Sequence, residues 1–285
     1  MCKPYVKSPL NYTGGKFKIL DDLFLLFPPK IDTFVDMFAG GFNVGINADA
    51  NRIVCNDHIN YLIELYKYLK NTETKKIVSD IKKRIKEFNL SLENKEGYKS
   101  LRERYNRDKN IVDFFVLICY SFNHQIRFNN SHEFNTPFGK DRSCYNESIE
   151  KNLINFSNML KAKSVEFTND DFTNIDYDSL GENDFVYCDP PYLITTGSYN
   201  DGKRGFKDWT EKEENELLNL LDNLNKRKIK FALSNVFYHK GLKNKMLINW
   251  SKKYKVNYIN KNYNNCSYHF KNRTAKTVEV LVTNY

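Results

Sequence analysis

The sequence predicts an α/β protein with a largely parallel sheet, and two observations predict it. Short apolar runs typical of buried strands alternate with helical patterns in residues 1–58 and again in residues 164–285. Between these stretches, residues 59–163 carry apolar residues at helical spacing almost throughout. The alternation therefore indicates one sheet whose chain is interrupted by a long, mainly helical segment.

Seven runs read as strands because they are short, apolar and bounded by turn residues. They are residues 33–38, 52–56, 165–168, 184–188, 229–233, 255–259 and 277–283. Helical patterns separate most of them, which favours parallel pairing. The last two have no helix between them, so one of this pair is expected to run antiparallel.

The first motif is the stretch Asn11-Tyr12-Thr13-Gly14-Gly15-Lys16. A helical pattern follows from Lys16 and stops at Pro28-Pro29. Bare backbone N–H groups at a Gly pair, next to a lysine, are suited to binding a carboxylate or phosphate. The alternative is an ordinary glycine turn with a solvated lysine.

The second motif follows the strand 33–38. Residues 39–45 form a glycine-rich turn, which we expect to lead into a helix, and the next strand ends at Asp57. An acid about 20 residues beyond such glycines is typical of a nucleotide site, where it binds ribose hydroxyls. The glycines do not match the dinucleotide pattern G-x-G-x-x-G, so an adenosine-containing cofactor is the better interpretation.

The helical middle of the chain ends in a polar, aromatic stretch at 121–140. Runs 125–128 and 133–136 flank a polar turn and predict a β-hairpin. Side chains such as Gln125, Arg127 and Asn129 are of the types that contact adenine and guanine edges. The alternative is a polar surface hairpin. Further helices are predicted within 73–107, at 111–120, 146–162 and 210–226, and near 239–252.

The strand 184–188 runs into the tetrapeptide Asp189-Pro190-Pro191-Tyr192. Two prolines lack the N–H that a central strand needs, so the strand ends at Asp189. The Asp189 carboxylate and the Pro190 carbonyl are two acceptors for one amino group, and the ring of Tyr192 can stack on a flat base. This predicts a site for a planar molecule with an exocyclic amine. A strand-ending turn is the plainer interpretation.

The composition limits the kinds of partner, metal site and compartment that we expect. Lys and Arg number 44 against 35 Asp and Glu, a net charge of +9 that fits a polyanion such as nucleic acid. The six cysteines form no Cys-x-x-Cys pair, so we predict no metal and a reducing compartment. Because the chain has no signal-like start and no long apolar run, we expect a cytoplasmic protein that spans no membrane.

Taken together, the motifs resemble the DNA N6-adenine methyltransferases of the Dam type, in the α group of amino-methyltransferases, nearly from end to end. The resemblance rests on the first motif, the glycine turn, the hairpin and the tetrad in that order, together with shorter matches. These shorter matches are Asn56-Asp57, Asp171-Phe172, Ser234-Asn235 and residues 279–285.

The resemblance implies a seven-stranded, Rossmann-like methyltransferase fold that uses S-adenosyl-L-methionine and acts on double-stranded DNA. Residues 1–58 and 164–285 would be the catalytic domain, and 59–163 an inserted, mainly helical DNA-recognition domain that carries the hairpin. The family includes restriction-modification enzymes of bacteria and phages, so we expect a monomer at the nucleoid of a bacterial or phage-infected cell.

The resemblance also implies residue roles. The cofactor would be held by Tyr12, Lys16, Phe38, Ala39, Gly40, Asp57, His58, Asp171, Phe172 and Asp189. The target adenine would be held by Asp189, Pro190, Pro191 and Tyr192. Arg127 and Pro137 match positions that read the outer half of GATC, so the resemblance implies a target adenine within GATC. Phe122 and Asn123 match positions that enter the base stack or face the orphaned base.

The chain departs from the family pattern at several positions. Asp36-Met37 replaces Glu-Pro before the glycine turn, Tyr12 replaces a tryptophan, and His124-Gln125 replaces Gly-Leu in the hairpin. The last change weakens the transfer of base specificity, because readout depends on individual side chains. The alternatives are an amino-methyltransferase acting on cytosine N4, RNA adenine or protein glutamine, and a DNA-binding protein with a decayed catalytic domain.

Overall fold

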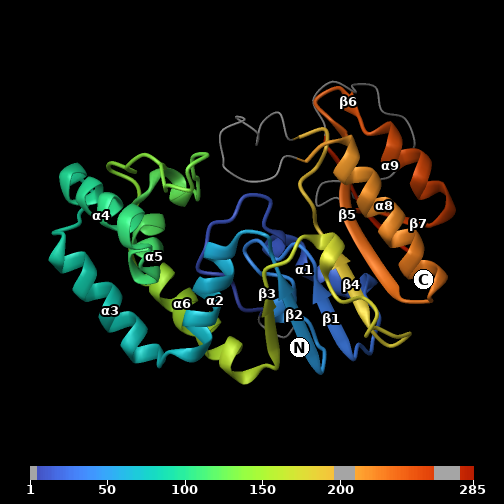
Figure 1. The fold of residues 1–285 in the computed structure, drawn as a ribbon, viewed down its shortest axis with the longest axis horizontal. Coiled ribbons are helices and arrows are strands. Elements are labelled where there is room, and N and C mark those ends of the chain that lie inside the picture. The colour runs from blue at the N-terminus through green and yellow to red at the C-terminus, as the bar shows by residue number, and fades with distance from the viewer. Residues whose placement is uncertain (1–4, 196–208, 260–276) are drawn as a thin grey trace.

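The computed structural model describes residues 5–195, 209–259 and 277–285 (Figure 1). Its strands form one mixed sheet in the order β3-β2-β1-β4-β5-β8-β7, with β6 paired to the end of β5. The strands are β1 (Thr33–Asp36), β2 (Arg52–Asn56), β3 (Val165–Thr168), β4 (Phe185–Cys188), β5 (Lys230–His239), β6 (Leu242–Lys243), β7 (Lys255–Ile259) and β8 (Val278–Thr283). All seven predicted strands are therefore confirmed.

The pairing pattern defines where a ligand can bind. The strands β1 to β5 pair in parallel, and β8 runs antiparallel to both β5 and β7, as the missing helix predicted. From β1 the chain moves outward through β2 to β3 and then returns to β4 on the other side of β1. This reversal opens a crevice at the carboxyl ends of β1 and β4, the usual ligand site of such sheets.

Alternating side chains divide the core between the two faces of the sheet. On one face, residues such as Phe34 and Phe185 pack with α1 (Leu20–Leu26), α2 (Asn60–Asn71) and α6 (Glu147–Ala162). On the other face, their neighbours Val35 and Val186 pack with α8 (Glu211–Lys226) and α9 (Lys245–Trp250). Helices thus cover both faces, which explains why the central strands β1 and β4 are buried at every position.

The helical insertion lies to one side of the sheet (Figure 1). It contains α3 (Thr74–Glu87), α4 (Lys95–Asp108) and α5 (Ile111–Tyr120), and α2 and α6 connect it to the sheet. The apolar core runs without a break from α2 and α6 into α5. The domain limits at 59 and 163 therefore stay a prediction, because the packing marks no polar boundary there.

Two predicted helices are wrong in part. The glycine turn leads only into a short 3-10 turn, Gly45–Asn47, whose first N–H donates to the Asp36 side chain at 2.9 Å. The helix predicted near 239–252 begins only at Lys245. Before it, Lys240 and Gly241 have positive φ and turn the chain from β5 into β6. Polar turn chemistry outweighed helical spacing in both places.

Two strand predictions also need correction. The strand expected to end at Ser234-Asn235 continues to His239, because its backbone keeps pairing with β8 past an irregularity between Val236 and Tyr238. The hairpin does not form two regular strands. It pairs through the isolated bridges Ser121↔Phe138 and Phe128↔Phe134, because its polar side chains bond the backbone that a ladder would use.

Among the described residues, no helix has both the length and the apolar composition to cross a membrane.

A buried ion pair connects the helices of the insertion. Asp113, at the start of α5, has no exposed surface. Arg104 from α4 donates to both of its oxygens, at 2.8 and 2.9 Å, and Arg84 from α3 lies 2.6 Å away. The two arginines balance the buried carboxylate, so the three helices depend on one another at this point.

We predict that Asp113→Ala lowers the free energy of unfolding by about 3–5 kcal/mol, because it leaves arginine charges without their buried partner. Urea unfolding followed by circular dichroism measures this. Glu64→Ala, which breaks an exposed pair with Lys67, is the matched control and should leave the unfolding midpoint unchanged. Equal midpoints for the two variants would contradict a stabilising role for Asp113.

Candidate active site

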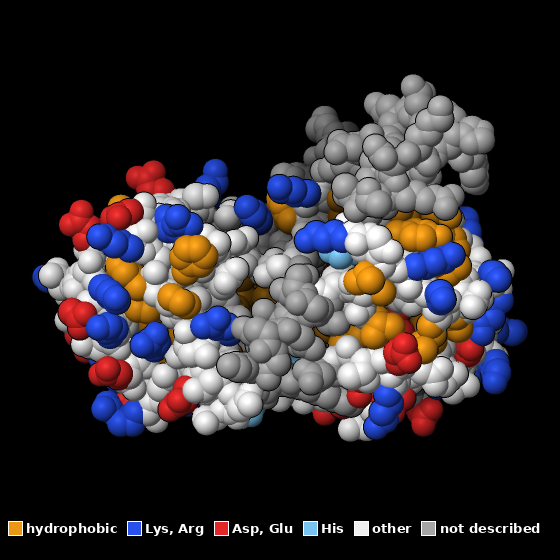
Figure 2. Space-filling view, turned by 90° about the horizontal axis from the view of Figure 1, so that it is seen from above, with side chains coloured by type: hydrophobic (Ala, Val, Ile, Leu, Met, Phe, Trp, Pro, Cys, Tyr) orange, Lys and Arg blue, Asp and Glu red, His pale blue; other side chains and the backbone are white. Residues whose placement is uncertain are grey.

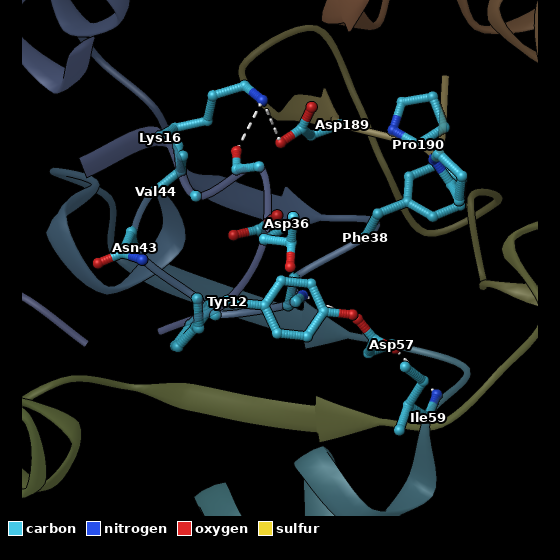
Figure 3. A pocket seen from close by; sticks show the side chains of 18 of the residues that line it. Tyr12, Lys16, Asp36, Phe38, Asn43, Val44, Asp57, Ile59, Asp189 and Pro190 are labelled. Atoms are coloured by element: carbon cyan, nitrogen blue, oxygen red, sulfur yellow. Dashed lines mark hydrogen bonds and ion pairs between the residues drawn. The ribbon is translucent and has the colours of Figure 1, made fainter. Parts of the chain in front are cut away.

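A cavity of about 260 Å³ lies at the carboxyl ends of β1, β2 and β4 (Figure 3). It is lined by the first motif, the glycine turn and the tetrad, which are far apart in sequence. The strand order explains this convergence, because parallel neighbours end at the same edge of the sheet. The cavity thus gathers the motifs that the sequence singled out.

Lys16, Asp189 and Tyr192 form a closed polar triangle in this cavity. The Lys16 ammonium lies 2.8 Å from Asp189 Oδ2 and donates to the Tyr192 hydroxyl at 2.7 Å, and that hydroxyl donates to Asp189 Oδ1 at 2.8 Å. Burial opposes the lysine charge, but Asp189 outweighs it, so the pKa of Lys16 is raised above its ordinary value. Lys16 is therefore the fixed counter-ion of Asp189.

The glycine turn leaves room for a ring. Gly40 has φ +47°, and a Cβ on it would lie 2.7 Å from Cε1 of Tyr12. A Cβ on Gly41 would lie 2.9 Å from Cβ of Tyr12. The Tyr66 hydroxyl donates to the Gly40 carbonyl and holds the turn from α2. Glycine is thus required here so that the backbone can approach Tyr12 and the cavity.

Asp57 is buried at the end of β2 and supports the same turn. Its oxygens accept from the N–H groups of Gly40 at 2.8 Å and Ile59 at 2.9 Å. Burial raises the pKa of Asp57, against the opposing effects of His58 and these two hydrogen bonds. A carboxylate has about four acceptor positions. Asp57 can therefore accept further hydroxyl groups while holding the turn.

Asp36, at the end of β1, is a third buried acid in the cavity and is labelled in Figure 3. Burial raises the pKa of Asp36 to about 8. The hydrogen bond from the Gly45 N–H opposes this shift, and the charges of Asp189 and Asp57 add to it. Asp36 is therefore largely protonated at neutral pH, as expected when several acids share one apolar site.

A second cavity, of about 70 Å³, adjoins the first. Its lining includes His58, Asp171 and Phe172, and it shares Phe38, His58, Pro191 and Trp209 with the large cavity. Asp171 Oδ1 accepts from the backbone and hydroxyl of Thr173, which shapes the turn that carries Phe172. The two cavities are thus adjacent spaces, and aromatic rings and acidic side chains line both of them.

The predicted site residues fall into three groups. The large cavity is lined by Tyr12, Lys16, Phe38, Ala39, Gly40, Asp57, His58, Arg127, Asp189, Pro190, Pro191 and Tyr192. Asp171 and Phe172 line the small cavity. The remaining residues lie outside both cavities: Phe122, Asn123, Gln125, Asn129 and Pro137.

The hairpin bends sharply beside the cavity. Asn123 and His124 both have positive φ, which is uncommon for residues other than glycine and marks a constrained turn. Asn11 holds this turn by donating to the Asn123 carbonyl at 3.1 Å, and Phe122 stays exposed beneath the Arg142 guanidinium. Arg127 reaches the cavity while its Nε donates to Asn135 at 2.9 Å.

Sequence reasoning missed two features of this site. Trp209 borders both cavities, although it lies outside every motif. The contact of Lys16 with Asp189 was also missed, since Lys16 was assigned to the cofactor alone. An acid after a strand could have identified Asp36 as a site residue, but no local signal marks Trp209. Among the described residues, no three His, Cys, Asp or Glu side chains lie close enough together to hold a metal ion.

The protonation of Asp36 predicts how stability depends on pH. Its pKa is higher in the folded protein than the value of 3.8 for a free side chain, so the folded state binds more protons between pH 3.8 and about 8. This stabilisation is complete below pH 3.8 and is lost as the pH rises, by at most about 1.4 kcal/mol per pH unit.

We predict that Asp36→Asn stabilises the ligand-free protein relative to wild type at pH 8.5 and not at pH 4, because asparagine carries no charge to bury. Thermal melts across this range measure the difference. Asp49→Asn, an exposed change, is the control. A difference between Asp36→Asn and wild type that does not vary with pH would contradict a raised pKa.

Comparison with known proteins agrees with this geometry. The model of the D12 class N6 adenine-specific DNA methyltransferases matches residues 12–274. The chain is 50% identical to the type II methyltransferase M.FokI of Planomicrobium okeanokoites and 48% identical to the modification methylase StsI of Streptococcus sanguinis. Each match covers 99% of this chain but only 43% of the relative, so the chain spans less than half the length of these proteins.

A more distant match covers both proteins evenly. The chain is 29% identical to the DNA adenine methylase of Escherichia coli K12, over 79% of each chain. Residues 12–274, which the family model matches, include the first motif from Tyr12 onward, the glycine turn, the hairpin and the tetrad, whose side chains meet in or beside the cavity. The chain belongs to the D12 class of N6 adenine-specific DNA methyltransferases.

Proposed function

We propose that this chain transfers a methyl group from S-adenosyl-L-methionine to N6 of an adenine that is flipped out of duplex DNA. The observation that carries the proposal is the position of Asp189. It stands at the end of β4, in one cavity with the glycine turn and Asp57, and its carboxylate is held by Lys16 and Tyr192. A nucleoside-binding site and an amine-binding carboxylate therefore share one space.

The residues present fit the cofactor. The narrow turn at Gly40, where a Cβ would meet Tyr12, admits a ligand against the backbone, and Asp57 offers acceptors for ribose hydroxyls. Phe172, His58 and Asp171 line a space suited to a purine with an amino group. Tyr12 and the turn at Phe38 and Ala39 would hold the methionine end. When bound, the cofactor supplies an electrophilic methyl group.

Asp189 and the Pro190 carbonyl would activate the target. They accept the two N6–H bonds of the adenine, which keeps the nitrogen lone pair out of the ring and makes it a better nucleophile. Pro191 fixes the backbone at this point, and the ring of Tyr192 stacks on the flipped base. The remaining acceleration comes from holding the amine against the methyl group in a fixed orientation.

The closed triangle defines what must change on binding. Each Asp189 oxygen already accepts one bond, from Lys16 or from the Tyr192 hydroxyl. A target amine therefore takes a remaining acceptor position or displaces the Tyr192 hydroxyl. Lys16 stays paired with the carboxylate in either case, since its ammonium is buried 2.8 Å from Asp189 Oδ2. We infer that the main role of Lys16 is to pair with Asp189, and that it also contacts the cofactor.

DNA would lie across the face seen in Figure 2. That face carries Lys and Arg side chains on both lobes of the protein, the helical insertion and the sheet with its helices. The net charge of +9 supports phosphate contacts and predicts binding that weakens with salt. Exposed Phe122, Asn123, Gln125 and Pro137, with Asn129 and Arg127, are the proposed contacts to bases. We expect a monomer that works at the bacterial nucleoid.

The recognition sequence is the finer part of the proposal. Arg127 and Pro137 favour GATC. Two observations favour instead the target of M.FokI and StsI. The chain has His124-Gln125 where Dam-type enzymes have Gly-Leu, and it is more similar to these two proteins than to the Escherichia coli methylase. We propose that the chain methylates adenine within the site that these methylases modify, with GATC as the alternative.

We predict that a methylation-deficient host expressing the chain acquires N6-methyladenine at one sequence motif, detected by single-molecule sequencing. Asp189→Ala should lower methylation at least about 100-fold, because it removes an acceptor and leaves Lys16 unpaired. Asp184→Ala, in the loop before β4, is the control for folding. Undiminished methylation by Asp189→Ala would contradict the mechanism, and a GATC motif would decide between the two targets.

We predict that Tyr192→Phe keeps most of the methylation rate and that Tyr192→Ala loses at least about 10-fold, because stacking on a base needs the ring and not the hydroxyl. Single-turnover rates with saturating DNA measure this. Loss of the rate in Tyr192→Phe, equal to that in Tyr192→Ala, would assign the function to the hydroxyl bond with Asp189 instead.

A further inference from the structure

Trp209 lines the candidate active site, although it belongs to none of the sequence motifs. Its side chain is 8% exposed and lines both the large and the small cavity. Its ring centroid lies 5.6 Å from those of Phe38 and Phe172, and these two rings are also 5.6 Å apart. The three rings thus form one aromatic cluster where the two cavities meet.

A buried carboxylate fixes the orientation of this indole. Glu214 has no exposed surface, and its Oε2 accepts from the Trp209 N–H at 2.7 Å. Its Oε1 accepts from the amides of Asn235 at 3.3 Å and Asn244 at 3.0 Å. The indole is therefore tied to the middle of β5 and to the N-cap of α9 as well as to its own helix.

The place of this pair in the helix is unusual. Thr210 caps α8 and forms a capping box with Glu213, so Trp209 and Glu214 occupy the two positions that usually make an apolar contact at a helix start. A leucine at position 214 would make this apolar contact with Trp209 without burying a charge. A buried carboxylate costs free energy unless it is well bonded, so capping alone does not account for Glu214.

We propose that Trp209 contacts the nucleoside of the S-adenosyl cofactor, and that Glu214 is a positioning residue that holds the indole against that site. This inference rests on the proposed function and adds two residues to it. Asp57 lines the large cavity and Phe172 lines the small one. An adenosine ligand with its ribose at Asp57 and its purine beside Phe172 would therefore extend from one cavity into the other, past Trp209, Phe38 and Pro191, which line both. The indole face supplies contact area there, and the bond to Glu214 prevents rotation of the ring.

The chain contains its own matched control. Trp250, the other tryptophan of the sequence, donates its indole N–H to Asp222 of the same helix α8 at 2.9 Å. Trp250 packs with Phe231 and Tyr254 and lines neither cavity. Trp250→Phe therefore removes the same kind of bond from the same helix without touching the proposed site.

The test measures binding of S-adenosylhomocysteine by titration calorimetry without DNA. Relative to wild type, Trp209→Ala should weaken binding by about 10-fold, the size expected for a lost aromatic contact. Glu214→Leu should weaken it by about 3-fold or more, Glu214→Gln, which keeps an acceptor, by less, and Trp250→Phe not at all. The KM for S-adenosylmethionine should rise in Trp209→Ala while the KM for DNA stays the same.

A second readout does not depend on stability. In Trp250→Phe, Trp209 is the one remaining tryptophan, so S-adenosylhomocysteine should change the tryptophan emission of that variant, and adenosine should do so at higher concentration. Wild-type affinity in a folded Trp209→Ala, or emission that bound ligand leaves unchanged, would overturn the inference alone. A wild-type protein that binds no S-adenosylhomocysteine would overturn the proposed function with it.

Discussion

Three carboxylates at the ends of three neighbouring strands set the main constraint on this structure. Asp36, Asp57 and Asp189 follow β1, β2 and β4 and line one cavity. Like charges that share an apolar space raise one another's pKa, so the arrangement is stable only if each acid is compensated differently. Asp189 is paired with Lys16, Asp57 is bonded by two backbone N–H groups, and Asp36 retains its proton at neutral pH.

The surrounding fold supplies these three solutions. The first motif delivers Lys16 from a turn that precedes the sheet, and its ammonium also donates to the Gly14 carbonyl at 3.1 Å. The glycine turn presents its N–H groups because Gly40 can adopt positive φ, and Tyr66 of α2 holds that turn. Stability and function thus depend on the same bonds, since the groups that bond one another in the site are those proposed to contact cofactor and base.

The two lobes contribute in different ways. The sheet fixes the acids on rigid strand ends, which suits chemistry that depends on orientation. The insertion presents its polar residues on an irregular hairpin, held by Asn11 and by side-chain bonds to its own backbone. The proposed chemistry and the proposed base contacts thus belong to different parts of the fold.

The order of strands and helices was readable from the sequence, because buried strands and amphipathic helices carry periodic patterns. The tetrad, the glycine turn and Asp57 were readable too, since each combines a strand end with a residue type that few other structures need. The tertiary structure alone decided the partners. It paired Lys16 with Asp189, 173 positions away in the sequence, raised the pKa of Asp36 by burial and brought Trp209 against Phe172. Such contacts and pKa shifts depend on burial and on which strands end side by side. Neither property can be predicted from a local sequence pattern.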